Sequence, residues 1–248
     1  MAKKELVNQK KRKWWYRGMK SLMHGRYPEP QFIYLGEKIG KGGIILSNHE
    51  GTDAPMSLEL YMDAPLTMWG AHEMNSGLVK MYKYQTRVYY HEKKHWNLHL
   101  ARLFCLIASP LTNLFYKGLE LISTYKDARF KKTLSESMEA IKRGDNIVIF
   151  PEDSSDGYLD TLKGFFSGFV MLGEVALREG IDLPIYVSYF KKNEKVYIID
   201  APVMYSTLKN ECAGKKEIAE RLVNRCNELG KMDYNAYLEA EAKPTEKD

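Results

Sequence analysis

The sequence is poor in cysteine and has no long apolar run. Its 3 cysteines, Cys105, Cys212 and Cys226, are widely separated, which favours reduced thiols in a reducing compartment over a disulfide framework. No stretch of about 18 apolar residues occurs, so the sequence predicts no membrane-spanning helix. No apolar core follows the first lysines, so we expect no signal peptide. Internal repeats and low-complexity segments are also missing, which excludes a repeat architecture.

What remains is an ordinary globular composition. The chain has 248 residues, of which 44% are hydrophobic and 28% are charged, and a chain of this size can bury the core of one domain. We expect an α/β domain over residues 31–230, preceded by a basic amphipathic segment (1–30) and followed by a polar C-terminal tail (231–248).

Positive charge is concentrated at the N-terminus. Within residues 1–20, Glu5 is the one acidic residue, and Trp14, Trp15 and Tyr16 sit among the basic residues. The basic residues are Lys3, Lys4, Lys10, Lys11, Arg12, Lys13, Arg17 and Lys20. Basic groups beside tryptophans suit an anionic bilayer surface, although nucleic acid would attract the same charges and a solvated tail is the simplest alternative. We expect a membrane surface as partner and no nucleic acid, with the protein cytoplasmic and peripheral on the inner face of the membrane.

Short apolar runs alternate with longer segments of helical periodicity. The expected strands are 31–35, 43–47, 66–70, 119–123, 147–150, 184–190 and 196–201. The expected helices are 1–25, 55–62, 78–115 with a break near Pro110, 130–143, 165–178 and 217–229. This alternation predicts an α/β fold: a mixed, mostly parallel central sheet flanked by helices, with a basic helix at the N-terminus.

Polar residues follow two of the expected strands directly. Asn48 and His49 leave the strand 43–47, and Phe150-Pro151-Glu152 leaves the strand 147–150. Open α/β sheets bind ligands at the carboxyl ends of their strands. We therefore expect one site built from these two strand ends.

His49 and Asp53 are the candidate catalytic residues. A histidine held by a carboxylate is a ready general base, because the carboxylate fixes the tautomer and stabilises the imidazolium. Gly51 and Pro55 oppose a continuous helix here, so pairing the two side chains requires a compact turn. The structural alternative is that Asp53 caps the following helix and His49 bonds to backbone.

In their order and spacing, these pieces resemble the glycerolipid acyltransferase family, which includes 1-acylglycerol-3-phosphate acyltransferase. The family has an Asn-His turn with a following Asp, a Gly-x-x-hydrophobic-x-Arg block, a Phe-Pro-Glu-Gly-Thr-Arg-Ser block and a Pro-Ile-x-x-Val strand. The matching pieces here are Asn48-His49 with Asp53, residues 118–125, residues 150–156, and residues 183–187, with Lys163-Gly164 similar to a segment after the third block.

The resemblance implies an enzyme of lipid metabolism, in phospholipid biosynthesis, that moves a fatty acyl group from acyl-CoA or acyl carrier protein to a lipid acceptor. His49 would deprotonate the acceptor and Asp53 would orient His49. The substrate-binding residues would be Asn48, Glu152, Ser154 and Ser155 at the acceptor, and Lys126, Arg129 and Lys163 at the phosphates of the donor. A thioester is already activated, so we expect no metal and no cofactor.

The chain departs from the family pattern at three places. Three residues rather than four separate His49 from the next aspartate, Asp53. In the second block, the family's arginine falls near Ser123 or Thr124, and Lys126 and Arg129 are the basic residues close by. In the third block, Asp153-Ser154-Ser155-Asp156 replaces the Gly-Thr-Arg-Ser run, which removes the arginine that would bind an acceptor's phosphate. We therefore expect a hydroxyl or amine acceptor without a phosphate.

Two other functions compete with acyl transfer. His91-Glu92-Lys93-Lys94-His95 matches the His-Glu-x-x-His pattern of zinc hydrolases, in which two histidines on one helix face hold the metal. A non-catalytic lipid-binding protein is the third interpretation. The apolar stretch 103–115 would guide the acyl chain from the bilayer, or would simply pack in the core.

Overall fold

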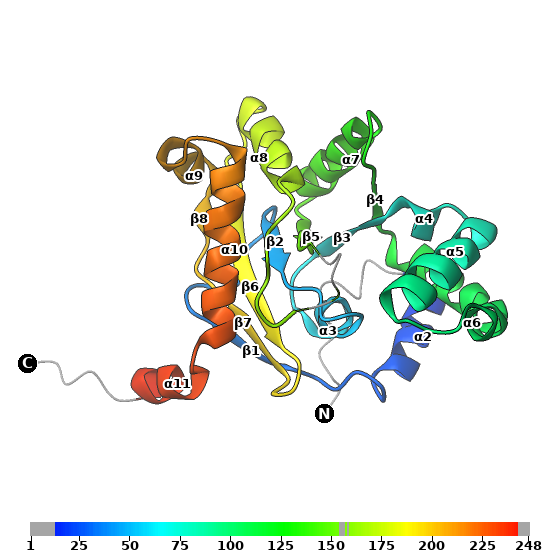
Figure 1. Cartoon of the computed structure of the whole chain (residues 1–248). Coiled ribbons are helices and arrows are strands. Elements are labelled where there is room, and N and C mark those ends of the chain that lie inside the picture. Colours follow the sequence, from blue (N-terminus) through cyan, green and yellow to red (C-terminus); the bar gives the residue numbers. More distant parts are fainter. Residues whose placement is uncertain (1–12, 154–156, 158, 243–248) are drawn as a thin grey trace, which may run out of the picture.

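The computed structural model describes residues 13–153, 157 and 159–242, and Figure 1 shows a central sheet with helices on both faces. The predicted α/β class is confirmed: the sheet is mixed and mostly parallel. Helix α2 (Trp14–Met23) begins the described chain, so the expected basic helix is present from Trp14, and residues 1–12 lie outside the described part.

Eight strands form one sheet in the described residues, and β2 (Ile44–Ser47) lies at its centre. From one edge to the other the order is β1 (Gln31–Tyr34), β7 (Val196–Ile199), β6 (Pro184–Lys191), β2, β5 (Asn146–Ile149), β3 (Leu66–Ala71) and β4 (Ile122–Thr124), while β8 (Val203–Met204) pairs with β6. Strand β2 is parallel to both of its neighbours, whereas β6 is antiparallel to β7 and β8.

The two faces of the sheet are covered by different helices. Ile44 and Leu46 point into the larger core cluster, with α7 (Phe130–Lys142), α8 (Gly168–Arg178) and α10 (Lys215–Lys231). Ile45 points into a second cluster with α3 (Asp53–Tyr61). Successive residues of a strand point to opposite faces of the sheet, which is why Ile45 faces away from Ile44 and Leu46. Helices cover both faces, so β2 is buried throughout.

A separate helical cluster stands beyond the β4 edge of the sheet (Figure 1). We call it the helical annex; it comprises α2, α4 (His72–Asn75), α5 (Leu78–Tyr84), the π-helix η1 (Gln85–Lys93) and α6 (Leu98–Leu119). Helix α2 joins the annex to the sheet domain through a buried ion pair, 2.8 Å between Lys20 Nζ and Glu59 Oε1 of α3. It also packs against α6, where a Cβ on Gly118 would lie 2.1 Å from the Tyr16 ring.

The helix break expected near Pro110 is wrong. Helix α6 continues through Pro110 to Leu119, and the interruption falls earlier, at residues 94–97. Asn97 starts the new helix by accepting a 2.9 Å hydrogen bond from the backbone N–H of His99, the bond expected of an N-cap. The Pro110 ring is exposed on α6, so the helix loses one hydrogen bond there without a clash in the core.

The C-terminal segment also differs from the expected polar tail. Helix α11 (Tyr234–Ala242) lies within 231–248, and its residues Tyr234, Tyr237 and Leu238 pack against the larger core cluster. Two tyrosines and a leucine thus give this otherwise charged segment apolar contacts with the domain. The overall polarity of the segment does not predict these contacts. Residues 243–248 lie outside the described part.

Candidate active site

The two polar strand ends meet, as predicted. Strands β2 and β5 are parallel neighbours, with Leu46 opposite Ile149. Three residues after Leu46 and one residue after Ile149, the His49 and Phe150 rings pack together, with centroids 4.9 Å apart and planes at 55°. A single site therefore has His49 from one strand end and Phe150-Pro151-Glu152 from the next.

Asn48 is a structural residue next to His49. Its side chain is buried, with 1% of the residue exposed, and it bonds twice to the backbone of Phe190 on β6. Asn48 Nδ2 donates to the Phe190 carbonyl at 3.1 Å, and Asn48 Oδ1 accepts from the Phe190 N–H at 2.7 Å. These bonds tie the exit of β2 to β6 and use the side chain of Asn48 for backbone contacts directly before His49.

A left-handed turn follows His49. Glu50 and Gly51 have φ angles of +41° and +66°, and a positive φ is uncommon in a residue other than glycine. The turn closes with a 3.2 Å hydrogen bond from the Asp53 N–H to the Glu50 carbonyl. A compact turn therefore separates His49 from Asp53.

Asp53 is the first residue of α3 rather than its N-cap, which is Thr52. The side chain of Asp53 is paired with cations: Lys192 Nζ, in the β6–β7 turn, lies 2.8 Å from Oδ2, and Arg26 lies 3.8 Å from Oδ1. The hydrogen bond to Asp53 raises the pKa of Lys192. Lys192 is thus the partner of one oxygen of Asp53, and the other oxygen faces Arg26.

Glu152 forms the second wall of the site. It is 8% exposed and sits in an antiparallel bridge with Phe165. On either side of it, the Asp153 N–H donates to the Gly164 carbonyl at 3.2 Å and the Phe166 N–H to the Pro151 carbonyl at 2.7 Å. The segment that contains Lys163 is thereby held beside Glu152, while Ser154 and Ser155 lie outside the described residues.

Carboxylates and Lys192 act on Glu50, the residue after His49. Burial raises the pKa of Glu50, and Asp160 and Asp53 add to the effect while Lys192 opposes it. Burial also raises the pKa of Tyr189, with Glu50, Asp160 and Glu152 acting in the same direction. The Tyr189 hydroxyl donates to the Asp160 carbonyl at 2.8 Å.

Lys192, Tyr189 and Asp160 were not among the predicted site residues. Each reaches the site from a distant part of the chain, and none stands in a motif. Glu50 could have been chosen, because it directly follows His49 and precedes a glycine, the sequence signal of a turn.

Two neighbouring tyrosines of η1 are partly buried in the helical annex. Burial raises the pKa of Tyr89 on η1, and Tyr27 and Asp53 add to the effect. Tyr90, beside it, has its pKa raised to about 12 by burial and by Tyr89. A π-helix is rare and often marks a functional position, and here it places Tyr89 within electrostatic reach of Asp53.

Lys126 and Arg129 are remote from His49. They follow β4, three strands from β2, and strands are spaced about 4.8 Å apart. The Arg129 guanidinium is bonded to Asp127, with Nη2 2.6 Å from Oδ2, and stacks 4.5 Å from the Tyr125 ring centroid. An acyl donor that binds at His49 would have to extend along the carboxyl edge of the sheet to reach these two residues.

The His-Glu-x-x-His pattern is not on one regular helix. The π-helix η1 ends at Lys93, and His95 has a left-handed φ of +56°. His91 Nδ1 lies 2.9 Å from the carbonyl oxygen of Trp96. Within the described part of the chain, no three His, Cys, Asp or Glu residues are grouped to hold a metal ion. His91 and His95 are therefore not on one face of a helix, as a zinc site of this kind requires.

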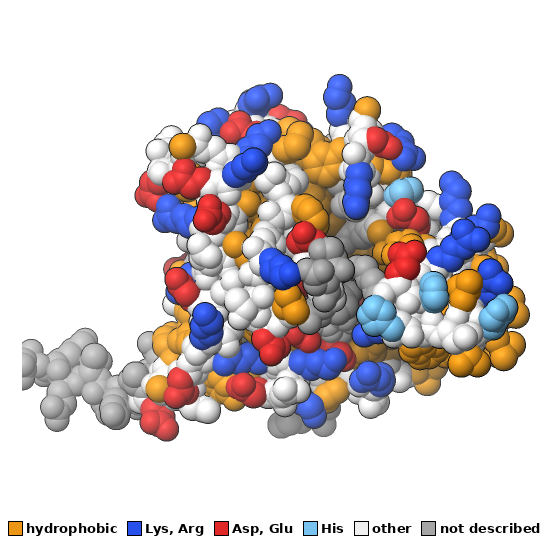
Figure 2. Space-filling view, viewed as in Figure 1, with side chains coloured by type: hydrophobic (Ala, Val, Ile, Leu, Met, Phe, Trp, Pro, Cys, Tyr) orange, Lys and Arg blue, Asp and Glu red, His pale blue; other side chains and the backbone are white. Residues whose placement is uncertain are grey.

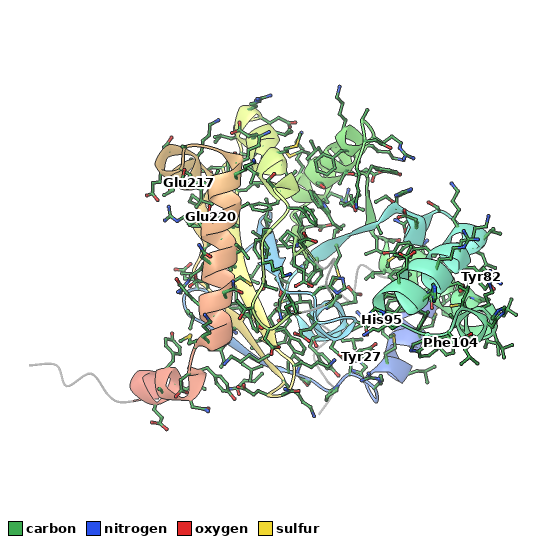
Figure 3. The ribbon with its side chains drawn as sticks, in the orientation of Figure 1. Tyr27, Tyr82, His95, Phe104, Glu217 and Glu220 are labelled. Atoms are coloured by element: carbon green, nitrogen blue, oxygen red, sulfur yellow. The ribbon has the colours of Figure 1, made fainter. Side chains whose placement is uncertain are left out.

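A cavity of about 810 Å³ lies away from His49, along α9 (Tyr205–Glu211) and α10. Glu217 and Glu220 mark its position in Figure 3, on the opposite side of the molecule from His95 and Phe104 of the helical annex. Arg225 in its wall is held by Asp200 at 2.6 Å and 2.9 Å. We give this cavity no part in the chemistry, because Arg225 in its wall is already paired with Asp200 and Glu228.

No family model matches this sequence, and a search of curated proteins finds no similar chain.

Proposed function

We propose that this protein is an acyltransferase that moves a fatty acyl group from a thioester donor, acyl-CoA or acyl carrier protein, to a hydroxyl or amine acceptor. The observation that carries the proposal is the packing of His49 against Phe150, which joins two of the motifs behind the family resemblance at adjoining strand ends. The carboxyl edge of a parallel sheet is the usual place for such a site.

His49 acts as the general base. Its imidazole removes the proton from the acceptor O–H or N–H as the oxygen or nitrogen attacks the thioester carbonyl. The tetrahedral intermediate then expels the thiolate, which takes the proton back from the imidazolium. The products are an ester or amide and a free thiol, and the transfer needs no metal because the thioester supplies the activation.

The acceptor is a lipid-related molecule without a phosphate. Glu50 directly follows His49, and Asp153 directly follows Glu152, so carboxylates flank both strand ends and disfavour an anionic acceptor, although Lys192 neutralises Asp53. A hydroxyl or amine compound fits better, and an amine that arrives as an ammonium would be drawn in. Asp53 orients His49, and Lys163 contacts the donor's phosphates, as Lys126 and Arg129 would for a donor that lies along the sheet edge.

The enzyme acts at the inner face of the membrane, and the basic segment before α2 supports this location. The test is a panel of radiolabelled acyl donors against neutral lipids, lipid amines and lysophosphatidate. The wild type should turn over the neutral and amine acceptors and His49→Ala should lose about 100-fold or more in kcat. Good activity on lysophosphatidate alone would overturn the acceptor assignment, and equal turnover by His49→Ala would overturn the base.

A non-catalytic lipid-binding protein is the remaining alternative. It would show no donor consumption with any acceptor, while His49→Ala would bind lipid like the wild type.

A further inference from the structure

Helix α6 exposes a large apolar face. We call this the α6 face; its side chains are between 44% and 74% exposed. They are Leu100, Leu103, Phe104, Leu106, Ile107, Leu111 and Leu114. Figure 2 shows hydrophobic side chains gathered at the outer end of the helical annex, where α6 lies. A contiguous exposed patch of this kind marks an interaction site.

The α6 face is one continuous stripe. Its members recur at intervals of three and four residues, the spacing that places side chains along one side of a helix. The opposite side is packed on the annex, where Ala101, Cys105 and Ser109 are fully buried. With 22 residues and a rise of about 1.5 Å per residue, the helix runs for roughly 33 Å.

Positive charge surrounds the stripe. Exposed cations stand on α6 and on the two elements packed against it: Arg102, Lys117, Lys80, Lys83 and Arg87. Figure 2 shows blue Lys and Arg side chains beside the apolar patch. Helix α2 crosses the C-terminal end of α6 at Gly118, exposes Trp14 (83%) and Leu22 (84%), and is joined directly to the basic residues 3–13 of the sequence.

We infer that the α6 face docks on an anionic lipid bilayer, with the helix lying in the plane of the interface. An apolar stripe bordered by Lys and Arg is the pattern of interfacial helices, and anionic headgroups are the complement to the flanking cations. A second copy of this chain fits less well, because a two-fold interface would bring the same cations face to face.

The helix lies along the bilayer and does not cross it. By length and composition α6 could cross a membrane. Its inner side, however, packs on η1 and α5, and Ser109 donates a 2.7 Å hydrogen bond to Gln85 of η1.

Docking through α6 rests on the membrane location in the proposed function and names the surface that binds the bilayer. It does not depend on the chemistry at His49. Helix α6 packs on η1 and α5, so docking through α6 would bring the bilayer to the helical annex, beyond the β4 edge of the sheet (Figure 1).

The test is vesicle flotation of the full chain with phosphatidylcholine vesicles, with and without phosphatidylglycerol. The wild type should float with the anionic vesicles, and more weakly at high salt. Leu103→Gln/Ile107→Gln/Leu111→Gln should lower the partition coefficient at least about 30-fold, whereas the matched control Met171→Gln/Met204→Gln, at exposed apolar residues on α8 and β8, should leave it unchanged.

Failure to float with anionic vesicles, or equal flotation of the triple variant, would overturn docking. So would a wild-type dimer that the triple variant converts to monomer, because a second copy would then occupy the face. Turnover of a soluble donor and a water-soluble amine is measured in parallel. It should be unchanged in the triple variant and lost in His49→Ala, so docking and chemistry fail separately.

Discussion

The imidazole of His49 packs on the phenyl ring of Phe150, with 4.9 Å between the ring centroids. The two residues leave neighbouring parallel strands, and Phe150 belongs to the Phe-Pro-Glu segment that carries part of the family resemblance. The contact explains how segments 100 residues apart in the sequence contribute to one site. It also makes the position of the candidate base depend on the pairing of β2 with β5.

Asn48 should be important for stability as well as for activity. Asn48→Ala removes both bonds to Phe190 and leaves a buried N–H and C=O of β6 without this partner, at a cost of about 2–4 kcal/mol. Urea unfolding measures this loss, and the exposed Asn193→Ala is the control, expected within about 0.5 kcal/mol of wild type. A loss of activity at unchanged stability would instead place Asn48 at the acceptor.

The pair of Asp53 and Lys192 separates two roles for the carboxylate. If Asp53 serves His49, Asp53→Asn should lower kcat at least about ten-fold, whereas Lys192→Met should keep it within about three-fold. The double variant should match Asp53→Asn. Lys192 is half exposed, so its loss should cost less than about 1 kcal/mol. An equal fall in kcat for the two single variants would mean that the ion pair itself is required.

The buried pair of Lys20 and Glu59 should hold α2 on the domain. Lys20→Met leaves the Glu59 carboxylate in the interior without its ammonium and should cost about 3–5 kcal/mol, whereas Lys20→Met/Glu59→Leu should recover most of this loss. A thermal double-mutant cycle measures the coupling. In the exposed pair of Lys142 and Glu179, the same cycle should give less than about 1 kcal/mol. Equal coupling energies in the two pairs would contradict the stabilising role of the Lys20–Glu59 pair.

Glu50 should make stability depend on pH. Its pKa is raised by burial, so the folded state binds the proton more tightly than the unfolded state. As the pH rises from the unfolded pKa of about 4.3 through the raised folded pKa, the wild type loses stability. Glu50→Gln has no such loss and should gain relative to wild type between pH 4 and pH 7. Urea unfolding of the two proteins at pH 4 and pH 7 tests this. The same stability difference between Glu50→Gln and the wild type at both pH values would refute it.

The strands could be predicted well because their signals are local. Ile44-Ile45-Leu46 and Ile147-Val148-Ile149 are short apolar runs bounded by glycine and polar residues, and a parallel sheet buries such runs on both faces. Their adjacency followed from the rule that ligands bind where strands end. The predicted helix break near Pro110 was wrong because a proline ends a helix in most contexts, whereas an exposed proline ring is tolerated here.

The partners within the site could not be predicted. Lys192 takes the carboxylate of Asp53, and Asn48 bonds to Phe190; in each case the partner comes from the β6–β7 hairpin, far along the chain. Such contacts depend on strand order, which no local pattern contains. The left-handed conformation of Glu50 was equally hidden, since glycine rather than glutamate predicts a positive φ.

The central place of β2 has a consequence for synthesis. Its two neighbours, β5 and β6, follow it in the chain, and β6 begins only at Pro184. At about 5–20 residues per second on the ribosome, β2 waits on the order of ten seconds for its second partner. During that interval its apolar residues, fully buried in the finished protein, are without their final cover. Such nonlocal pairing folds slowly, and the nascent chain is an expected client of ribosome-associated chaperones.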